Sequence, residues 1–186
     1  PNAARRAITI RTADMKGLPT TRTSFPAAAD GSQTAARFDR LQVSSIPVNT
    51  PAFIAHVSQD GKWCLVETGF AFGWMTRRDL ALVDDDFAQT WENGSYVTPI
   101  KDGIPLSDKA GYRFATAIGT LFPKAGEQEE ALEILLASSD RKGKAVAGTA
   151  LVSKTAAATS PLPLNLRSIA GGANEFMDAP YSWGGK

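Results

Sequence analysis

The sequence has few of the residues that build metal sites and disulfides: one cysteine, Cys64, and one histidine, His56, occur among 186 residues. A single cysteine cannot form a disulfide within the chain, and there is no cluster of Cys and His at metal-ligand spacing. We therefore expect no metal site and no cofactor. One thiol says nothing about the cellular compartment, because many exported proteins also carry few thiols.

Long apolar runs and an excess of one charge are also missing. No run approaches the roughly 20 residues that span a bilayer, and no basic start followed by an apolar core marks a signal peptide. Twenty basic and 19 acidic residues nearly cancel, so the summed field does not draw the chain onto nucleic acid. We expect no membrane span and no nucleic-acid partner. Hydrophobic residues at 43% are ordinary for a globular fold.

Short strand-like runs separated by tight turns make up the first half of the chain. Residues 53–57 and 63–66 are apolar runs that flank the turn Gln59-Asp60-Gly61, a pattern typical of a β-hairpin. Further short runs follow at 71–75 and 80–83. Strands this short and this closely spaced predict a small β-barrel.

A second set of strand signals follows and repeats the first in its order. Residues 96–100 and 104–106 flank a turn at Asp102-Gly103, and more runs lie at 114–121, 131–137 and 145–152. The repetition predicts two tandem small barrels. Each is small enough to be only marginally stable alone, so packing against a neighbour is expected to stabilise both.

A helix is predicted after a linker of small, polar and proline residues. Asn165 can cap it, and apolar residues recur at helical spacing at Leu166, Ile169 and Phe176. Such an apolar face requires a packing partner. The domain boundaries predicted are an N-terminal extension at 1–11, a first barrel at 12–86, a linker at 87–95, a second barrel at 96–153, a linker at 154–163 and the start of a further domain at 164–186.

The end of the chain carries a specific resemblance. An apolar helix that runs into P-Y-S-W-G-G at 180–185 resembles the start of the catalytic domain in the NlpC family of cysteine peptidases. The segments L-P-T-T-R-x-x-F at 18–25, F-D-R-L-Q-V-S-S at 38–45 and G-W-M at 73–75 resemble the first bacterial SH3-like domain of its multidomain members. The resemblance implies a mainly β chain: two tandem SH3-like barrels, then the first helix of an α+β papain-like catalytic domain.

The same resemblance implies an activity for the intact protein. It would hydrolyse the γ-D-glutamyl to diaminopimelate bond of peptidoglycan stem peptides through a thiolate nucleophile with a histidine base. In the family the catalytic Asp-Cys-Ser follows the Y-x-W-G-G motif by a few residues. We therefore expect no catalytic residue within this chain, which would stop just before the cysteine. Its partners would be stem peptides and its own missing catalytic domain.

Five residues are candidates for substrate contact. The resemblance places Tyr181 at the substrate groove, with Trp183 beside it, and brings the first SH3-like domain over the active site. Asp39, Gln42 and Ser44 lie in a long loop of that domain and are candidates for contacting the free end of the substrate. The alternative interpretation is packing for Trp183 and loop hydrogen bonding for the other three.

The cysteine and histidine in the chain are interpreted as structural. Cys64 lies within a strand, where a cysteine behaves as a small hydrophobe rather than a nucleophile. His56 precedes the cysteine, whereas the family's histidines follow theirs. Trp63 and Trp74 stand next to turns, where packing is the first interpretation and a glycan or peptide groove the second.

Three functional hypotheses remain from the sequence. The chain is the part of a peptidoglycan endopeptidase that targets the wall and restricts the substrate groove. Alternatively it is a non-enzymatic cell-wall-binding module, or a structural brace for a catalytic domain. In each case we expect a periplasmic or extracellular protein associated with the cell wall, from which a signal or lipoprotein anchor has been removed.

Overall fold

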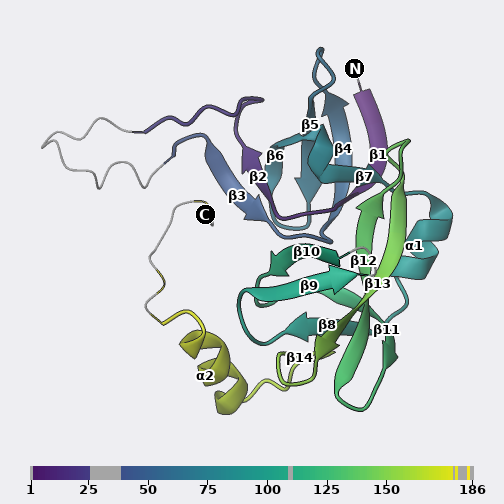
Figure 1. The fold of residues 1–186 in the computed structure, drawn as a ribbon. Coiled ribbons are helices and arrows are strands. Elements are labelled where there is room, and N and C mark those ends of the chain that lie inside the picture. The colour runs from purple at the N-terminus through teal and green to yellow at the C-terminus, as the bar shows by residue number, and fades with distance from the viewer. Residues whose placement is uncertain (1, 26–38, 109–110, 178, 180–183, 185–186) are drawn as a thin grey trace, which may run out of the picture.

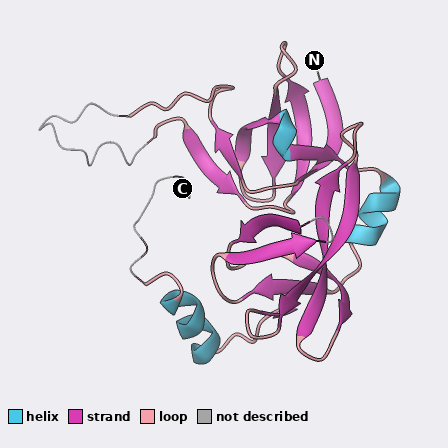
Figure 2. Cartoon of the chain, viewed as in Figure 1, coloured by secondary structure: helices cyan, strands magenta, loops and turns pink. Residues whose placement is uncertain are grey.

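The chain folds into two stacked β domains, and a helix lies at the side of the second (Figures 1 and 2). This computed structural model describes residues 2–25, 39–108, 111–177, 179 and 184. The prediction of a mainly β chain with two small domains and a C-terminal helix is confirmed. The sheets are open rather than closed barrels, because each has two edge strands.

The first domain is one antiparallel sheet in the strand order β3-β2-β6-β5-β4-β1-β7. The predicted hairpin is confirmed: Val57 pairs with Cys64, and the turn uses Gly61 at φ +71°. Met15, Val66 and Met75 lie at the centre of its core. Its elements are β1 (Asn2–Thr9), β2 (Ala13–Lys16), β3 (Gln42–Ile46), β4 (Pro51–Val57), β5 (Trp63–Thr68), β6 (Phe72–Thr76), the 3-10 turn η2 (Arg77–Asp79) and β7 (Leu80–Leu82).

Strand β1 comes from the segment that the sequence analysis treated as an N-terminal extension. It pairs with both β4 and β7, so the first sheet begins at Asn2. Ala7, Ile8 and Thr9 are buried, while the preceding Arg5 and Arg6 are exposed. The basic residues conceal the strand in the sequence, because the side chains of its first half are largely exposed and only those of its last three residues are buried.

The second domain combines a five-stranded sheet, β13-β12-β11-β8-β14, with the hairpin β9–β10. The predicted run 114–121 is divided: β10 ends at Thr116, and a turn with Gly119 at φ +81° follows. Part of the predicted linker 154–163 forms strand β14, which pairs with β8. The strands are β8 (Tyr96–Pro99), β9 (Ile104–Asp108), β10 (Gly111–Thr116), β11 (Phe122–Glu127), β12 (Ala131–Ser139), β13 (Ala145–Ser153) and β14 (Ala157–Ser160).

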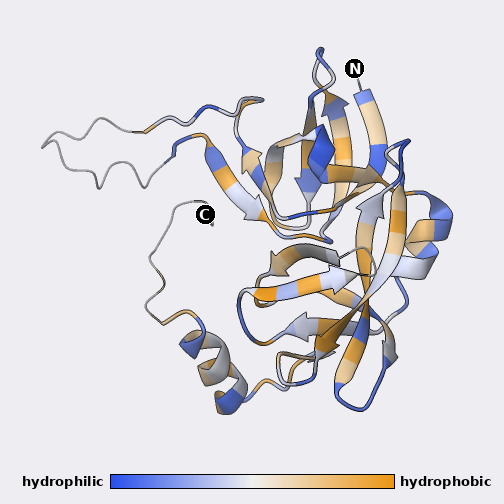
Figure 3. Cartoon of the chain, in the orientation of Figure 1, coloured by the Kyte–Doolittle hydropathy of each residue, from blue (hydrophilic) through white to orange (hydrophobic). Residues whose placement is uncertain are grey.

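The two domains share a buried junction. Helix α1 (Asp85–Trp91) lies in the stretch between them, and its Phe87 and Trp91 rings stack with centroids 5.0 Å apart. Both rings pack in an apolar cluster with Ile8 and Ala81 of the first domain and Leu135 and Ala137 of the second. Figure 3 shows hydrophobic and hydrophilic segments mixed along the strands and hydrophilic hairpin tips, as expected for sheets with one buried face.

Val48 and Asn49, in the segment between β3 and β4, contact the second domain directly. Val48 is fully buried within the core of the second domain, alongside Val97 and Phe122. Asn49 adopts φ +64°, and its side chain donates to the Leu135 carbonyl at 3.4 Å and accepts from the Ala137 amide at 3.2 Å. The first domain therefore supplies core and hydrogen-bonding groups to the second.

Helix α2 (Leu166–Asn174) begins as predicted, because the Asn165 side chain accepts a hydrogen bond from the Ser168 amide at 3.0 Å. Its apolar face is uncovered in the described chain: Leu166 is 86% exposed and Ile169 is 56% exposed. One contact links the end of the helix to the second domain, from the Asp102 amide to Glu175 Oε2 at 3.2 Å. Within the described residues, every helix is too short or too polar to cross a bilayer.

Candidate functional site

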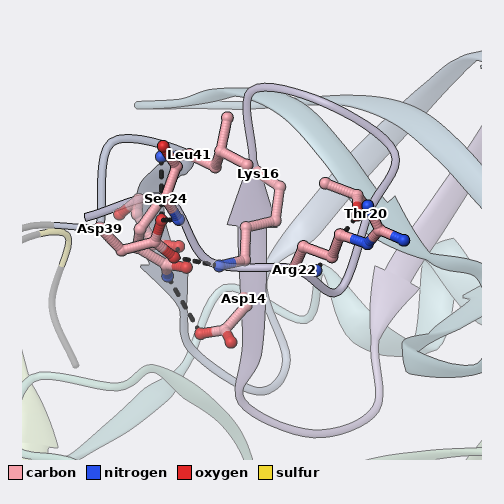
Figure 4. Close-up of polar contacts among 9 residues, drawn as sticks. Asp14, Lys16, Thr20, Arg22, Ser24, Asp39 and Leu41 are labelled. Atoms are coloured by element: carbon pink, nitrogen blue, oxygen red, sulfur yellow. Dashed lines mark hydrogen bonds and ion pairs between the residues drawn. The ribbon is translucent and has the colours of Figure 1, made fainter. Parts of the chain in front are cut away.

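A buried ion pair includes one of the candidate substrate residues, Asp39 (Figure 4). The prediction that Asp39, Gln42 and Ser44 share a long loop is wrong for two of them, because Gln42 and Ser44 pair with β2 as part of strand β3. Lys16 Nζ, from the end of β2, lies 2.6 Å from Asp39 Oδ2, just before β3. Lys16 and Asp39 are only 4% and 5% exposed. Asp39 Oδ1 also accepts from the Ser24 amide at 2.9 Å and the Leu41 amide at 3.1 Å. The Asp39 carboxylate thus links three parts of the first domain, namely the end of β2, the segment at Ser24 and the segment just before β3.

The local backbone explains why a lysine is buried here. The β2–β3 register shifts between Met15 and Lys16, so two consecutive residues of β2 are both buried. A regular strand would place one of them in solvent. The irregularity instead directs Lys16 toward Asp39, and the Gln42 amide closes a turn onto the Asp39 carbonyl at 3.0 Å.

The environment of Asp39 favours its charged form. Burial alone would raise the pKa of this carboxyl, but the hydrogen bond from Lys16 and those from the Ser24 and Leu41 amides together outweigh it. The pKa falls from its ordinary value of 3.8 to about 2. The Asp39 side chain is therefore an anion under all ordinary conditions, and its charge is neutralised within the protein by Lys16.

This lowered pKa predicts a pH dependence of stability. A carboxyl with a lower pKa in the folded state stabilises the fold above its unfolded pKa, and this contribution disappears as pH falls through the folded pKa. We expect the Asp39 contribution to be complete above about pH 5 and to be lost progressively from about pH 4 to pH 2. Urea unfolding of wild type and Asp39→Asn across this range measures it. A stability difference that stays constant down to pH 2 would contradict the assignment.

Gln42 is buried beside this ion pair, at 3% exposure. Its Nε2 donates to Asp14 Oδ1 at 3.0 Å and to the Ser44 carbonyl at 2.9 Å. Its Oε1 is buried and accepts no hydrogen bond among the described residues. Ser44 is half-buried, and its hydroxyl makes a long contact of 3.4 Å with the Ser45 carbonyl.

Gly184 of the Y-S-W-G-G motif packs directly on Gln42. It adopts φ +71°, and a Cβ at this position would lie 2.4 Å from Gln42 Cγ. Both observations require glycine, since a side chain would be strained in the backbone and would overlap Gln42. Gly184 therefore contacts the first domain at Gln42, one of the predicted substrate residues.

Gly184→Ala is expected to separate this segment from Gln42. The change should shift the Gln42 side-chain amide resonances and speed hydrogen exchange in β3, because Gln42 loses its cover. Gly171→Ala is the matched control: it lies in α2 with open space around its Cα, and it should stabilise the helix by about 1 kcal/mol without moving those resonances. Unchanged Gln42 resonances in Gly184→Ala would contradict the contact.

The structure thus brings together three of the five predicted site residues. Asp39 and Gln42 are buried in hydrogen bonds with Ser44 beside them, while Tyr181 and Trp183 lie outside the described residues. Asp39 makes backbone hydrogen bonds of the kind that the alternative interpretation expects. Lys16 and Asp14 were missed, and the only sequence signal was a lysine next to the apolar Met15 in a short strand.

The two residues interpreted as structural remain outside this cluster. Cys64 is buried in the first core, and burial raises the pKa of its thiol although Arg77 partly opposes the shift. A thiol in this environment is a poor nucleophile. His56 is exposed on β4. Among the described residues, no group of three or more His, Cys, Asp and Glu side chains could hold a metal ion.

Comparisons with known proteins agree with the two-domain architecture. The SH3 domain family of SH3b1 type matches residues 27–76, and the SH3 domain family of SH3b2 type matches residues 84–129. No curated protein matches the chain.

Two solved structures are similar over nearly the whole chain. One, described as a novel NlpC/P60 endopeptidase from Photobacterium damselae subsp. piscicida, is 26% identical with a TM-score of 0.78. It matches over 97% of this chain and 39% of its own. The other, an NlpC/P60 family protein from Bacillus cereus, is 17% identical with a TM-score of 0.70, over 97% of this chain and 66% of its own. The second likeness concerns the fold alone. The chain therefore contains two SH3-type domains in tandem, of which the first matches the SH3b1 type and the second the SH3b2 type.

Proposed function

We propose that this chain is the SH3 region of a peptidoglycan endopeptidase that cleaves the γ-D-glutamyl to diaminopimelate bond of stem peptides. One observation carries the proposal: both domains and the C-terminal segment together align with 39% of an NlpC/P60 endopeptidase. The SH3b1 and SH3b2 matches occur in that order along the chain. The protein would act outside the cytoplasm, at the cell wall.

The proposed division of labour places the chemistry outside the two SH3 domains. Amide hydrolysis by a thiolate needs a cysteine with a lowered pKa, a histidine base and donors for the oxyanion. Cys64 has the opposite properties, because it is buried and its pKa is raised. The SH3 domains would target the wall and narrow the substrate groove, and the Gly184–Gln42 contact supports a fixed position of the motif on the first domain.

The substrate role of the five candidate residues belongs to this proposal. Tyr181 and Trp183 would line the groove, and Asp39, Gln42 and Ser44, at and just before the start of β3, would contact the free end of the substrate. Because Asp39 and Gln42 are buried here, they would shape the surface that meets the substrate rather than present large surfaces to it.

The test uses the full reading frame that contains this chain. Expressed whole, the protein should hydrolyse free stem peptides to L-Ala-γ-D-Glu and a fragment that begins with diaminopimelate, as identified by mass spectrometry, and the 186-residue chain should not. A frame that closes at Lys186, or cleavage at a different bond, would overturn the proposal. The chain alone should still sediment with purified sacculi.

A non-enzymatic wall-binding module is the second candidate, and a structural brace is the third. The cation-lined groove described below favours wall binding as a function in its own right. Retention of the chain on sacculi together with a closed reading frame would support the module. If deletion of residues 1–153 leaves the bond specificity of the full protein unchanged, the SH3 domains are a brace.

A further inference from the structure

A groove at the junction of the two domains is lined by cations and contains one of the tryptophans. It encloses about 580 Å³, within the size range of about 300–1,000 Å³ that is usual for ligand sites. Lys62, Arg77 and Arg78 of the first domain and Lys142 of the second line it, together with Trp63. None of its described lining residues is acidic. In a protein with a net charge of +1 this is a local concentration of positive charge.

Most of these cations are available to a ligand. Among the described residues, Lys62, Arg77 and Lys142 make no ion pair, and Arg78 makes only a long one, with Nε 3.9 Å from Asp79 Oδ1. The nearby carboxylates of Asp60 and Asp140 accept hydrogen bonds from backbone amides of their own turns. Free guanidinium groups bind carboxylates and phosphates in a planar, two-pronged geometry.

The walls of the groove are fixed by backbone hydrogen bonds. The Arg77 amide donates to the Lys62 carbonyl at 2.9 Å, and Trp63 pairs with Thr76 across β5 and β6. On the other side, the Leu82 amide donates to the Gly143 carbonyl at 2.9 Å, which joins β7 to the β12–β13 turn. The groove is therefore preformed, and a ligand need not order it.

Trp63 connects this groove to a second hollow. The neighbouring cavity of about 360 Å³ shares Trp63 and Arg78 with the first. Its lining is of mixed charge, with Asp14 and Asp79 beside Arg11 and Lys16, so the uncompensated positive charge lies in the first groove. Trp63 is half-buried, so part of its indole ring is held by the protein and part is open. An indole with cations beside it suits a sugar that carries an anionic group. The C–H bonds on one face of the sugar ring would pack against the indole, and the anionic group would meet the cations.

We propose that this groove binds an anionic saccharide, with a pyranose ring against Trp63 and its carboxylate or phosphate between Arg77 and Lys142. The inference rests on the proposed role of the SH3 domains in targeting the cell wall. It adds the surface that would bind and the chemical class of the ligand. The anionic group has two sources: the carboxylate of a muramic-acid glycan, or the phosphodiester of a sugar-phosphate polymer. Both would leave peptide cleavage to a different part of the protein.

Isothermal titration with three probes separates these sources. The probes are glycan strands freed of their stem peptides, which carry muramic carboxylates, a glycerol-phosphate polymer, and the neutral oligomer chitohexaose. We expect one of the anionic probes to bind at least about tenfold more tightly than chitohexaose, and the tighter of the two identifies the source. Equal binding of all three probes, no binding of any, or tighter binding of a single-stranded oligonucleotide would overturn the proposal.

Variants locate the site. The double change Arg77→Gln and Lys142→Gln should weaken anionic binding at least about tenfold, and Trp63→Ala should weaken it several-fold. Both cations are exposed, so the fold should survive, and Trp63→Phe replaces Trp63→Ala if the latter does not fold. The control is the double variant Lys101→Gln and Arg167→Gln, which also removes one lysine and one arginine but outside the groove. It should bind the anionic probes as tightly as wild type. Binding that is equal in the two double variants would exclude the groove.

The inference and the proposed function can fail separately. If the groove variants bind sacculi and glycan as wild type while the full protein cleaves the expected bond, the groove proposal is wrong and the endopeptidase stands. If the full protein cleaves nothing but the chain binds anionic glycan through Arg77 and Lys142, the endopeptidase is wrong and the groove stands.

Discussion

Asp39→Ala is expected to lower the free energy of unfolding by about 3–5 kcal/mol, the usual cost of removing one partner from a buried ion pair. Lys16 Nζ, which is 2.6 Å from Asp39 in the wild type, would remain buried without its counter-charge. The Ser24 and Leu41 amides would lose their shared acceptor as well. Urea denaturation at neutral pH measures the loss.

A double variant tests whether the unpaired charge of Lys16 causes this loss of stability. Lys16→Met with Asp39→Asn removes both charges and keeps an oxygen that can accept from the two amides, so it should recover most of the stability. Glu129→Ala, at an exposed loop carboxylate, is the matched control and should change stability by less than about 0.5 kcal/mol. A loss below about 1 kcal/mol in Asp39→Ala would mean that Lys16 reaches water.

Trp91→Ala is expected to cost about 3–5 kcal/mol, as for other large aromatic residues removed from a core. The indole is buried between the domains and stacks on Phe87, and its loss leaves Ile8 and Leu135 facing a cavity. We also expect calorimetry to resolve two transitions in place of one, because the junction that couples the domains is weakened.

The matched control for this prediction is Phe70→Ala, since Phe70 is a large aromatic residue that is 63% exposed. Its removal should leave both the midpoint and the number of transitions unchanged. Trp91→Phe keeps a ring in the junction and should lose less than Trp91→Ala. A single transition at the wild-type temperature in Trp91→Ala would show that the junction contributes little.

Local signals made much of the fold predictable. The hairpin around Gly61 and the Asn165 cap each depend on a few neighbouring residues, and both are found where the sequence places them. Strand β1 was missed because its exposed Arg5 and Arg6 hide the alternation, and β14 because Ala157–Ser160 is composed of small and polar residues. Both strands depend on pairing with distant partners, which no local pattern contains.

The candidate site was predictable only in part for the same reason. Asp39, Gln42 and Ser44 were found through a motif, and they do lie together. Their partners Lys16 and Asp14 are more than 20 residues away along the chain, and a strand irregularity, not periodicity, turns Lys16 inward. The groove was missed because Arg77 and Lys142 become neighbours only when the two domains pack.

Because Val48 of the first domain is buried in the core of the second, the two domains form one structural unit and not two independent ones. A cut in the connecting stretch at 87–95, where the sequence suggests a boundary, would give a second domain with a hole where Val48 belongs and unpaired groups at Leu135 and Ala137. Gene rearrangements that move one domain without the other would therefore produce a damaged fold. In evolution and in protein engineering alike, the pair should be exchanged whole.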